Sequence, residues 1–209
     1  MEMIGGDAME GALFYWFSWL GWVWITFFTA KQNKYRFTLA FVLLILIISS
    51  PYKMEFLGIE VYIPAFVLLA FALIETAKLR NRIFFSVFVT SFIIMLGYVS
   101  FLLFELFDPV WVIFDRKWLI SLIVLLLATA LQSERNLQIM SIGIGMLLGE
   151  FLFSYIMKRL AFPYLVASPA FLDILSLATV ILGVWVSFQY FADLIGSYTN
   201  QGRGKQKSS

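Results

Sequence analysis

The feature that most constrains the fold of this chain is a succession of long apolar runs. The longest run, Ile83 to Phe107, contains a single charged residue, Glu105. About 20 apolar residues in a helix cross the ~30 Å hydrocarbon core of a bilayer. In lipid, a helix also satisfies its own backbone hydrogen bonds. Runs of this kind therefore predict transmembrane helices.

The composition supports a membrane protein and excludes several classes of chemistry. Of the 209 residues, 62% are hydrophobic and 13% are charged, and the mean hydropathy is +0.90, far from values typical of soluble domains. The chain has no cysteine and no histidine, which excludes disulfides, thiolate or imidazole metal sites and histidine-based nucleophilic triads. We therefore expect no metal and no cofactor.

Seven apolar runs alternate with short polar connections, so the expected fold class is all-α, a polytopic transmembrane bundle of about seven helices. Two of the runs, Phe37 to Ser50 and Trp118 to Leu131, are short for a span. The expected spans are Gly11 to Ala30, Phe37 to Ser50, Val61 to Ala77, Ile83 to Phe107, Trp118 to Leu131, Leu137 to Met157 and Ala170 to Ile195.

The distribution of Lys and Arg predicts the orientation. Alternate connections carry ten and five of these residues, and the richer set is expected in the cytoplasm. This places the N-terminus outside and the C-terminus in the cytoplasm. The expected organisation is a short extracytoplasmic segment 1–10, a single helical membrane domain 11–195 and a basic cytoplasmic tail 196–209. The clustered cations favour lipid headgroups, and no nucleic acid partner is expected.

The first apolar run is expected to be a transmembrane helix that stays in the mature protein, not a cleaved signal peptide. The residues before the first apolar run carry only acidic charges, unlike a secretory signal peptide, which begins with basic residues. The polar segment Ile4 to Ala8 further suggests that translation begins at Met9.

The segment Ser141 to Met157 contains Glu150, the residue of the sequence with the highest free-energy cost of insertion into a membrane. On a helix, Ser141, Gly145 and Gly149 recur every four residues and form a stripe of small side chains on which another helix can pack closely. A carboxylate at membrane depth costs about 2.5 to 3.5 kcal/mol on insertion scales and should face protein or trapped water.

Residues at a similar depth on other helices are the expected partners of Glu150. Counting along the spans brings the hydroxyls of Tyr98 and Thr179 to this level, and Ser154 lies on the same face of the helix. These residues form the candidate intramembrane polar site. A structural role and a functional role for Glu150 stay open. The remaining acidic residues near span ends are expected to be solvated or to snorkel: Glu75, Glu105, Asp108, Asp173 and Asp193.

The aromatic opening of the chain resembles a known family. Met9-Glu10-Gly11 is followed by Phe14-Tyr15-Trp16-Phe17-Ser18-Trp19-Leu20-Gly21-Trp22. This motif, the length and the span pattern resemble the YphA-type family of small membrane proteins of spore-forming Gram-positive bacteria. The resemblance implies a bacterial plasma-membrane location and a sporulation or envelope context. It provides no activity or site residues to transfer.

Three functions remain open from the sequence. The leading hypothesis is a non-enzymatic protein that acts by interaction with the lipid bilayer or with another membrane protein. The second is a small transporter or proton-coupled permease that uses Glu150. The third is an intramembrane lipid-modifying enzyme, with Glu150 or Asp173 as its acid or base.

Overall fold

The computed structural model describes residues 10–30, 32–33, 35–56, 58–108 and 114–206, with the backbone alone at 191 and 193–206. The expected start at Met9 and the side chain of Asp193 therefore lie outside the described residues. The helices are α1 (Ala12–Val23), which continues as the π-helical segment η2 (Trp24–Phe28), α2 (Arg36–Ser49), α3 (Pro64–Ala77), α4 (Asn81–Phe107), α5 (Arg116–Leu131), α6 (Arg135–Arg159) and α7 (Pro169–Gln206).

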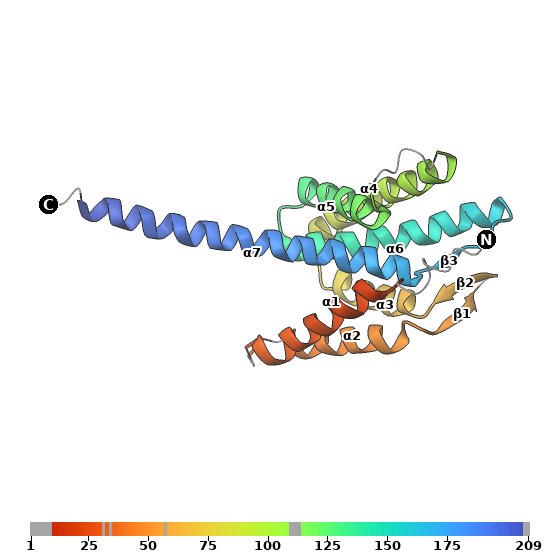
Figure 1. The fold of residues 1–209 in the computed structure, drawn as a ribbon, viewed down its shortest axis with the longest axis horizontal. Coiled ribbons are helices and arrows are strands. Elements are labelled where there is room, and N and C mark those ends of the chain that lie inside the picture. Colours follow the sequence, from red (N-terminus) through yellow and green to blue (C-terminus); the bar gives the residue numbers. More distant parts are fainter. Residues whose placement is uncertain (1–9, 31, 34, 57, 109–113, 207–209) are drawn as a thin grey trace.

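The helices form a bundle in which α6 occupies the centre. It packs against α3, α4, α5 and α7, while α1 packs against α2 and α7. In Figure 1, α7 projects well beyond the other helices toward the C-terminus, and its start lies at the opposite end of the molecule. α7 continues to Gln206, past the expected end of the seventh span at Ile195.

Three helices are long and apolar enough to cross a membrane within the described part of the chain. They are α4, α6 and the first part of α7, Pro169–Tyr190. α2 and α3 have 14 residues each, about 21 Å at 1.5 Å per residue, which is less than the ~30 Å core. The fold is that of a helical membrane protein. The described residues form seven α-helices and one π-helical segment, and seven spans remain a proposal.

The expectation of an all-α chain is incomplete, because the structure contains a small three-stranded sheet. Its strands are β1 (Lys53–Phe56), β2 (Ile59–Tyr62) and β3 (Leu165–Val166). β1 and β2 form an antiparallel hairpin, and β3 pairs in parallel with β2. The sheet joins the α2–α3 connection to the α6–α7 connection, and we call this end of the molecule the sheet end (Figure 1).

The sheet also corrects the start of the third expected span. Val61 was expected in a helix but lies in β2, where it is fully buried, and α3 begins at Pro64. Proline is well suited to the first helical turn because it needs no N–H partner there. Strands of four residues carry too short an alternating pattern to be separated from the adjoining apolar run.

α4 and α6 approach closely at the stripe of small residues. A Cβ atom built on Gly145 would lie 2.7 Å from Ile94 Cβ and 2.7 Å from the Ser91 carbonyl oxygen, and one built on Gly149 would lie 2.6 Å from Tyr98 Cδ1. Ser141, one turn before Gly145, is fully buried. Only small residues leave room for α4 at this distance, so the stripe places Tyr98 directly beside the turn of α6 that carries Glu150.

Candidate functional site

Glu150 lies in α6, about 13 Å along the helix axis from its end at Arg159. The side chain is completely inaccessible to solvent. A buried carboxylate is tolerated only when hydrogen-bond donors surround it. Glu150 therefore needs hydrogen-bond donors from the segments packed around it.

Three groups donate hydrogen bonds to the Glu150 carboxylate. The hydroxyls of Tyr98 and Tyr164 both donate to Oε1, at 2.5 and 2.9 Å. The backbone N–H of Ala167 donates to Oε2 at 2.9 Å. We call this arrangement the Glu150 clamp. It joins α4, α6 and the connection between α6 and α7 through one side chain.

The backbone of the α6–α7 connection is shaped to place the third donor. Ala167 follows β3 and has φ 54°, in the left-handed region that a residue with a Cβ rarely adopts. This conformation costs about 1 to 2 kcal/mol for a non-glycine residue. The buried hydrogen bond to Glu150 offsets that cost. The clamp and β3 together hold the connection against the bundle.

The structure brings together some of the predicted site residues. Tyr98 contacts Glu150 directly, and Ser154 is buried one turn further along α6. Thr179 is not part of the cluster, because its hydroxyl donates to the carbonyls of Leu175 and Ser176 in its own helix. Ala167, two residues before the start of α7, bonds to Glu150, so Thr179 lies about 15 Å further along α7 than the level of Glu150.

Tyr164 and Ala167 were missed by the sequence analysis. Both lie in the short connection before Pro169, the first residue of α7, where no helical periodicity indicates which side chains turn inward. The available signal was a tyrosine within 14 residues of the buried glutamate, in a connection that must return to the same end of the bundle. Burial and the neighbouring Glu150 raise the pKa of the Tyr164 phenol well above its ordinary value, so the hydroxyl stays protonated and remains a donor.

A cleft of about 900 Å³ with polar and apolar walls opens at the sheet end, and Tyr98, Glu150 and Tyr164 of the Glu150 clamp are among its lining residues. Its charged side chains include both signs, and one of them, Arg116, pairs with Glu105 at 3.1 Å. Lys158 lies across the hairpin, with Nζ 2.9 Å from a Cβ built on Gly58. The charged lining residues are Glu10, Glu55, Glu60, Arg116, Glu150 and Lys158.

Asp173 is a second buried carboxylate, which corrects the expectation that it is solvated. Its side chain is fully buried. It accepts hydrogen bonds from the backbone N–H groups of Gly11 and Phe14 at 3.0 and 2.9 Å, and it pairs with Lys117 Nζ at 2.6 Å. Asp173 therefore caps the free N–H groups at the start of α1 and ties α1 and α5 to α7.

Two other acidic residues have cationic partners near helix ends. Glu75 pairs with Lys78 at 2.5 Å, three residues further along the chain, and Glu105 pairs with Arg116 as described above. Both pairs are partly exposed, so each contributes little to stability.

Comparison with known proteins identifies the family. Residues 10–208 match the family model described as YphA-like integral membrane protein. The chain is 26% identical over 203 residues to "Uncharacterized protein YphA" of Bacillus subtilis (strain 168), covering 96% of this chain and 100% of that protein. No solved structure matches the chain. The resemblance carried by the aromatic opening is thus confirmed, and this chain belongs to the YphA-like family of integral membrane proteins.

Proposed function

We propose that this chain is a non-catalytic protein of the bacterial plasma membrane that acts by binding another membrane component, lipid or protein. In this proposal the bundle has about seven spans, the sheet end is extracytoplasmic and the C-terminus is cytoplasmic. The cleft at the sheet end is the binding site. The observation that carries the proposal is that both buried carboxylates already hold structural elements together.

A proton carrier or a general base needs an oxygen that can reach water or a substrate. Both oxygens of Glu150 are occupied by the three donors of the clamp. Both oxygens of Asp173 are occupied by two backbone N–H groups and by Lys117. These contacts favour a structural role for the two residues.

The exposed edge of the sheet supports a binding role. All four residues of β1 are exposed, and β1 is an outer strand of the sheet. An unpaired edge strand offers N–H and C=O groups to an extended segment of a partner. Lys53 and Glu55 on this strand, with the charges of the adjoining cleft, suit a partner segment that carries both signs of charge.

A proton-coupled permease is the second candidate, and the cleft is the observation that favours it. Glu150 is among the residues that line the cleft, so the cleft brings the surroundings of the sheet end close to this carboxylate. A charged or titrating group at membrane depth is a recurrent feature of proton pathways.

Proton flux in reconstituted vesicles separates the two candidates. The purified full-length protein and its Glu150→Gln variant are placed in vesicles of bacterial lipid with a pH-sensitive dye inside. The binding proposal predicts that both behave like empty vesicles under an imposed potential. A flux that depends on the wild-type protein and disappears in Glu150→Gln would establish the permease.

Site-specific photocrosslinking in cells tests binding at the cleft. A photoreactive residue replaces Glu55 in the cleft, and a matched control replaces Ser133, which is exposed in the α5–α6 connection at the opposite end of the bundle. We expect a discrete adduct from position 55 that is absent from position 133. Equal labelling at both positions would contradict a binding site at the sheet end.

A further inference from the structure

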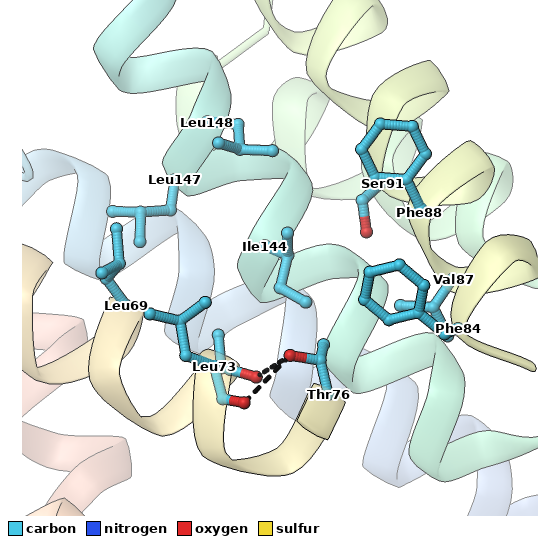
Figure 2. Close-up of a pocket in the computed structure, with 11 residues that line it drawn as sticks. Leu69, Leu73, Thr76, Phe84, Val87, Phe88, Ser91, Ile144, Leu147 and Leu148 are labelled. Carbon is cyan, nitrogen blue, oxygen red and sulfur yellow. Dashed lines mark hydrogen bonds between the residues drawn. The ribbon is translucent and has the colours of Figure 1, made fainter. Parts of the chain in front are cut away.

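A second cavity lies at the far end of the bundle from the sheet, between α3, α4 and α6. Its volume is about 220 Å³, below the range typical of small-molecule pockets. In Figure 2, Leu73 of α3, Phe84 and Phe88 of α4, and Ile144 and Leu148 of α6 surround the common space. The exposed fractions of Leu73, Phe84 and Phe88 are 61%, 47% and 56%, so the cavity is a groove that opens to the surroundings of the bundle.

The groove offers almost no polar group to a ligand. Its two hydroxyl side chains are Thr76 and Ser91. The hydroxyl of Thr76 donates to the carbonyls of Ala72 and Leu73, as the dashed lines in Figure 2 show. Ser91 is buried against α6. In a membrane protein, an apolar groove that opens sideways lies against lipid chains.

Two exposed arginines lie in the chain between two residues that line the groove. Thr76 and Phe84, which line it, are joined by the α3–α4 connection and the first turn of α4, where Arg80 and Arg82 are exposed. Lys78, in the same connection, pairs with Glu75. Within the described part of the chain, neither Arg80 nor Arg82 forms a salt bridge with an acidic side chain.

We propose that the groove and these two arginines form a binding site for one anionic phospholipid. One acyl chain lies in the groove between α3, α4 and α6, and the phosphate of the headgroup pairs with Arg80 and Arg82. Basic residues at the ends of membrane helices recognise anionic headgroups in this way. The site is separate from the cleft and stands whether or not the cleft binds a partner.

The groove lies between α3 and the two longer helices beside it, and residues of all three helices line it. With 14 residues, α3 is about 21 Å long, whereas α4 and α6 have 27 and 25 residues. Because the space between these three helices is open to the surroundings of the bundle, an acyl chain can enter it from the lipid. A single chain anchored by its headgroup fills this space better than freely exchanging lipid.

Lipid retention by the purified full-length protein tests the proposal. Native mass spectrometry and thermal unfolding are measured in mild detergent with added phosphatidylglycerol or phosphatidylcholine of identical acyl chains. We expect phosphatidylglycerol to be retained and to raise the unfolding temperature, and phosphatidylcholine to do neither. Equal retention and equal stabilisation by the two lipids would overturn the headgroup assignment.

Two pairs of variants locate the site. The double variant Arg80→Gln/Arg82→Gln should weaken phosphatidylglycerol binding about 30-fold at low salt, because each cation near an anionic headgroup contributes about 1 kcal/mol. Its control, Lys53→Gln/Arg159→Gln, removes two cations at the sheet end and should leave binding unchanged. If both double variants bind like the wild type, the phosphate does not lie at the α3–α4 connection.

The groove is tested with two neighbouring exposed residues of α3. Leu73 lines the groove and Ile74 does not, although their exposed fractions are similar, 61% and 58%. Leu73→Trp places a large ring at the groove and should reduce phosphatidylglycerol retention, whereas Ile74→Trp should not. Equal retention by the two variants would show that the acyl chain lies elsewhere.

Discussion

At the scale of single residues, the buried carboxylates of Glu150 and Asp173 are explained by the donors around them. Each accepts three hydrogen bonds from groups on other segments of the chain. A carboxylate without such donors would be excluded from an apolar interior by the cost of losing its hydration. Each residue therefore links elements that are far apart in sequence through its hydrogen bonds.

Replacing Glu150 tests this role. Glu150→Leu leaves two tyrosine hydroxyls and the Ala167 N–H without an acceptor, and we expect the free energy of unfolding to fall by about 3 kcal/mol or more. In Glu150→Gln, the amide oxygen can accept from Ala167 while the NH₂ group donates to both tyrosine oxygens, so the loss should stay below about 1 kcal/mol. Thermal unfolding in detergent measures both, and a Leu variant as stable as the wild type would contradict the clamp.

Tyr164 predicts a loss of stability at alkaline pH. Burial, followed by the neighbouring Glu150, raises the pKa of its phenol above the ordinary value of 10.0. The folded state therefore holds this proton more tightly than the unfolded chain does, so its contribution to stability is complete below about pH 10 and decreases above it.

Tyr164→Phe should make the alkaline decline of the unfolding free energy shallower, because the variant has no phenol proton to lose. The matched control is Tyr52→Phe, which removes a phenol that is 60% exposed at the same end of the molecule. Chemical unfolding at several values between about pH 8 and pH 11 gives the slopes. A slope in Tyr164→Phe as steep as that of Tyr52→Phe would show that Tyr164 does not couple folding to pH.

At the scale of elements, the contact between α4 and α6 sets the geometry of the clamp. The two helices touch through small residues of α6, so the position of Tyr98 relative to Glu150 is fixed by backbone distance. The sheet acts in the same way on the α6–α7 connection, because the pairing of Val166 with Val61 holds that segment beside Glu150.

Alanine substitutions within α6 test the close approach. Gly145→Ala would place Cβ 2.7 Å from the Ser91 carbonyl oxygen, which cannot move without shifting α4, and we expect a loss of about 1 to 3 kcal/mol. Gly143→Ala is the matched control, because no heavy atom lies within 4 Å of its Cβ position. There, the better helix propensity of alanine should leave stability unchanged or raise it by up to about 1 kcal/mol. Equal effects at the two positions would contradict the packing described here.

At the scale of the whole molecule, the two ends of the bundle differ in chemistry. The sheet end carries a cleft with mixed charges, while the other half of the bundle carries an apolar groove and the exposed Arg80 and Arg82. Connections rich in Lys and Arg are retained in the cytoplasm. The asymmetry between the connections therefore predicts that the sheet end faces outward.

Reporter fusions test the proposed topology. A reporter after Ser209 or at Ser133 should behave as cytoplasmic, and one before Met9 or at Gly58 in the hairpin should behave as extracytoplasmic. The measurement is the activity of a pair of reporters, each active on one side of the membrane only. Two cytoplasmic termini would mean that one of the short helices, α2 or α5, does not span.

The sequence by itself determined the membrane class, the seven helical segments and the burial of Glu150 against protein. These follow from local properties: apolar runs of sufficient length, short polar connections and the cost of a carboxylate among apolar residues. The stripe Ser141, Gly145 and Gly149 was visible for the same reason, since its spacing is a property of one helix.

Only the tertiary structure decided which residues meet. Tyr98 and Thr179 have the same expected depth, yet of the two only Tyr98 bonds to Glu150, because the α6–α7 connection returns into the bundle as far as Glu150 before α7 begins. Tyr164, Ala167 and the buried Asp173 became partners through contacts between segments up to 162 residues apart. Local patterns carry no information on such pairings, because donors meet their acceptors only when the helices and the sheet have packed.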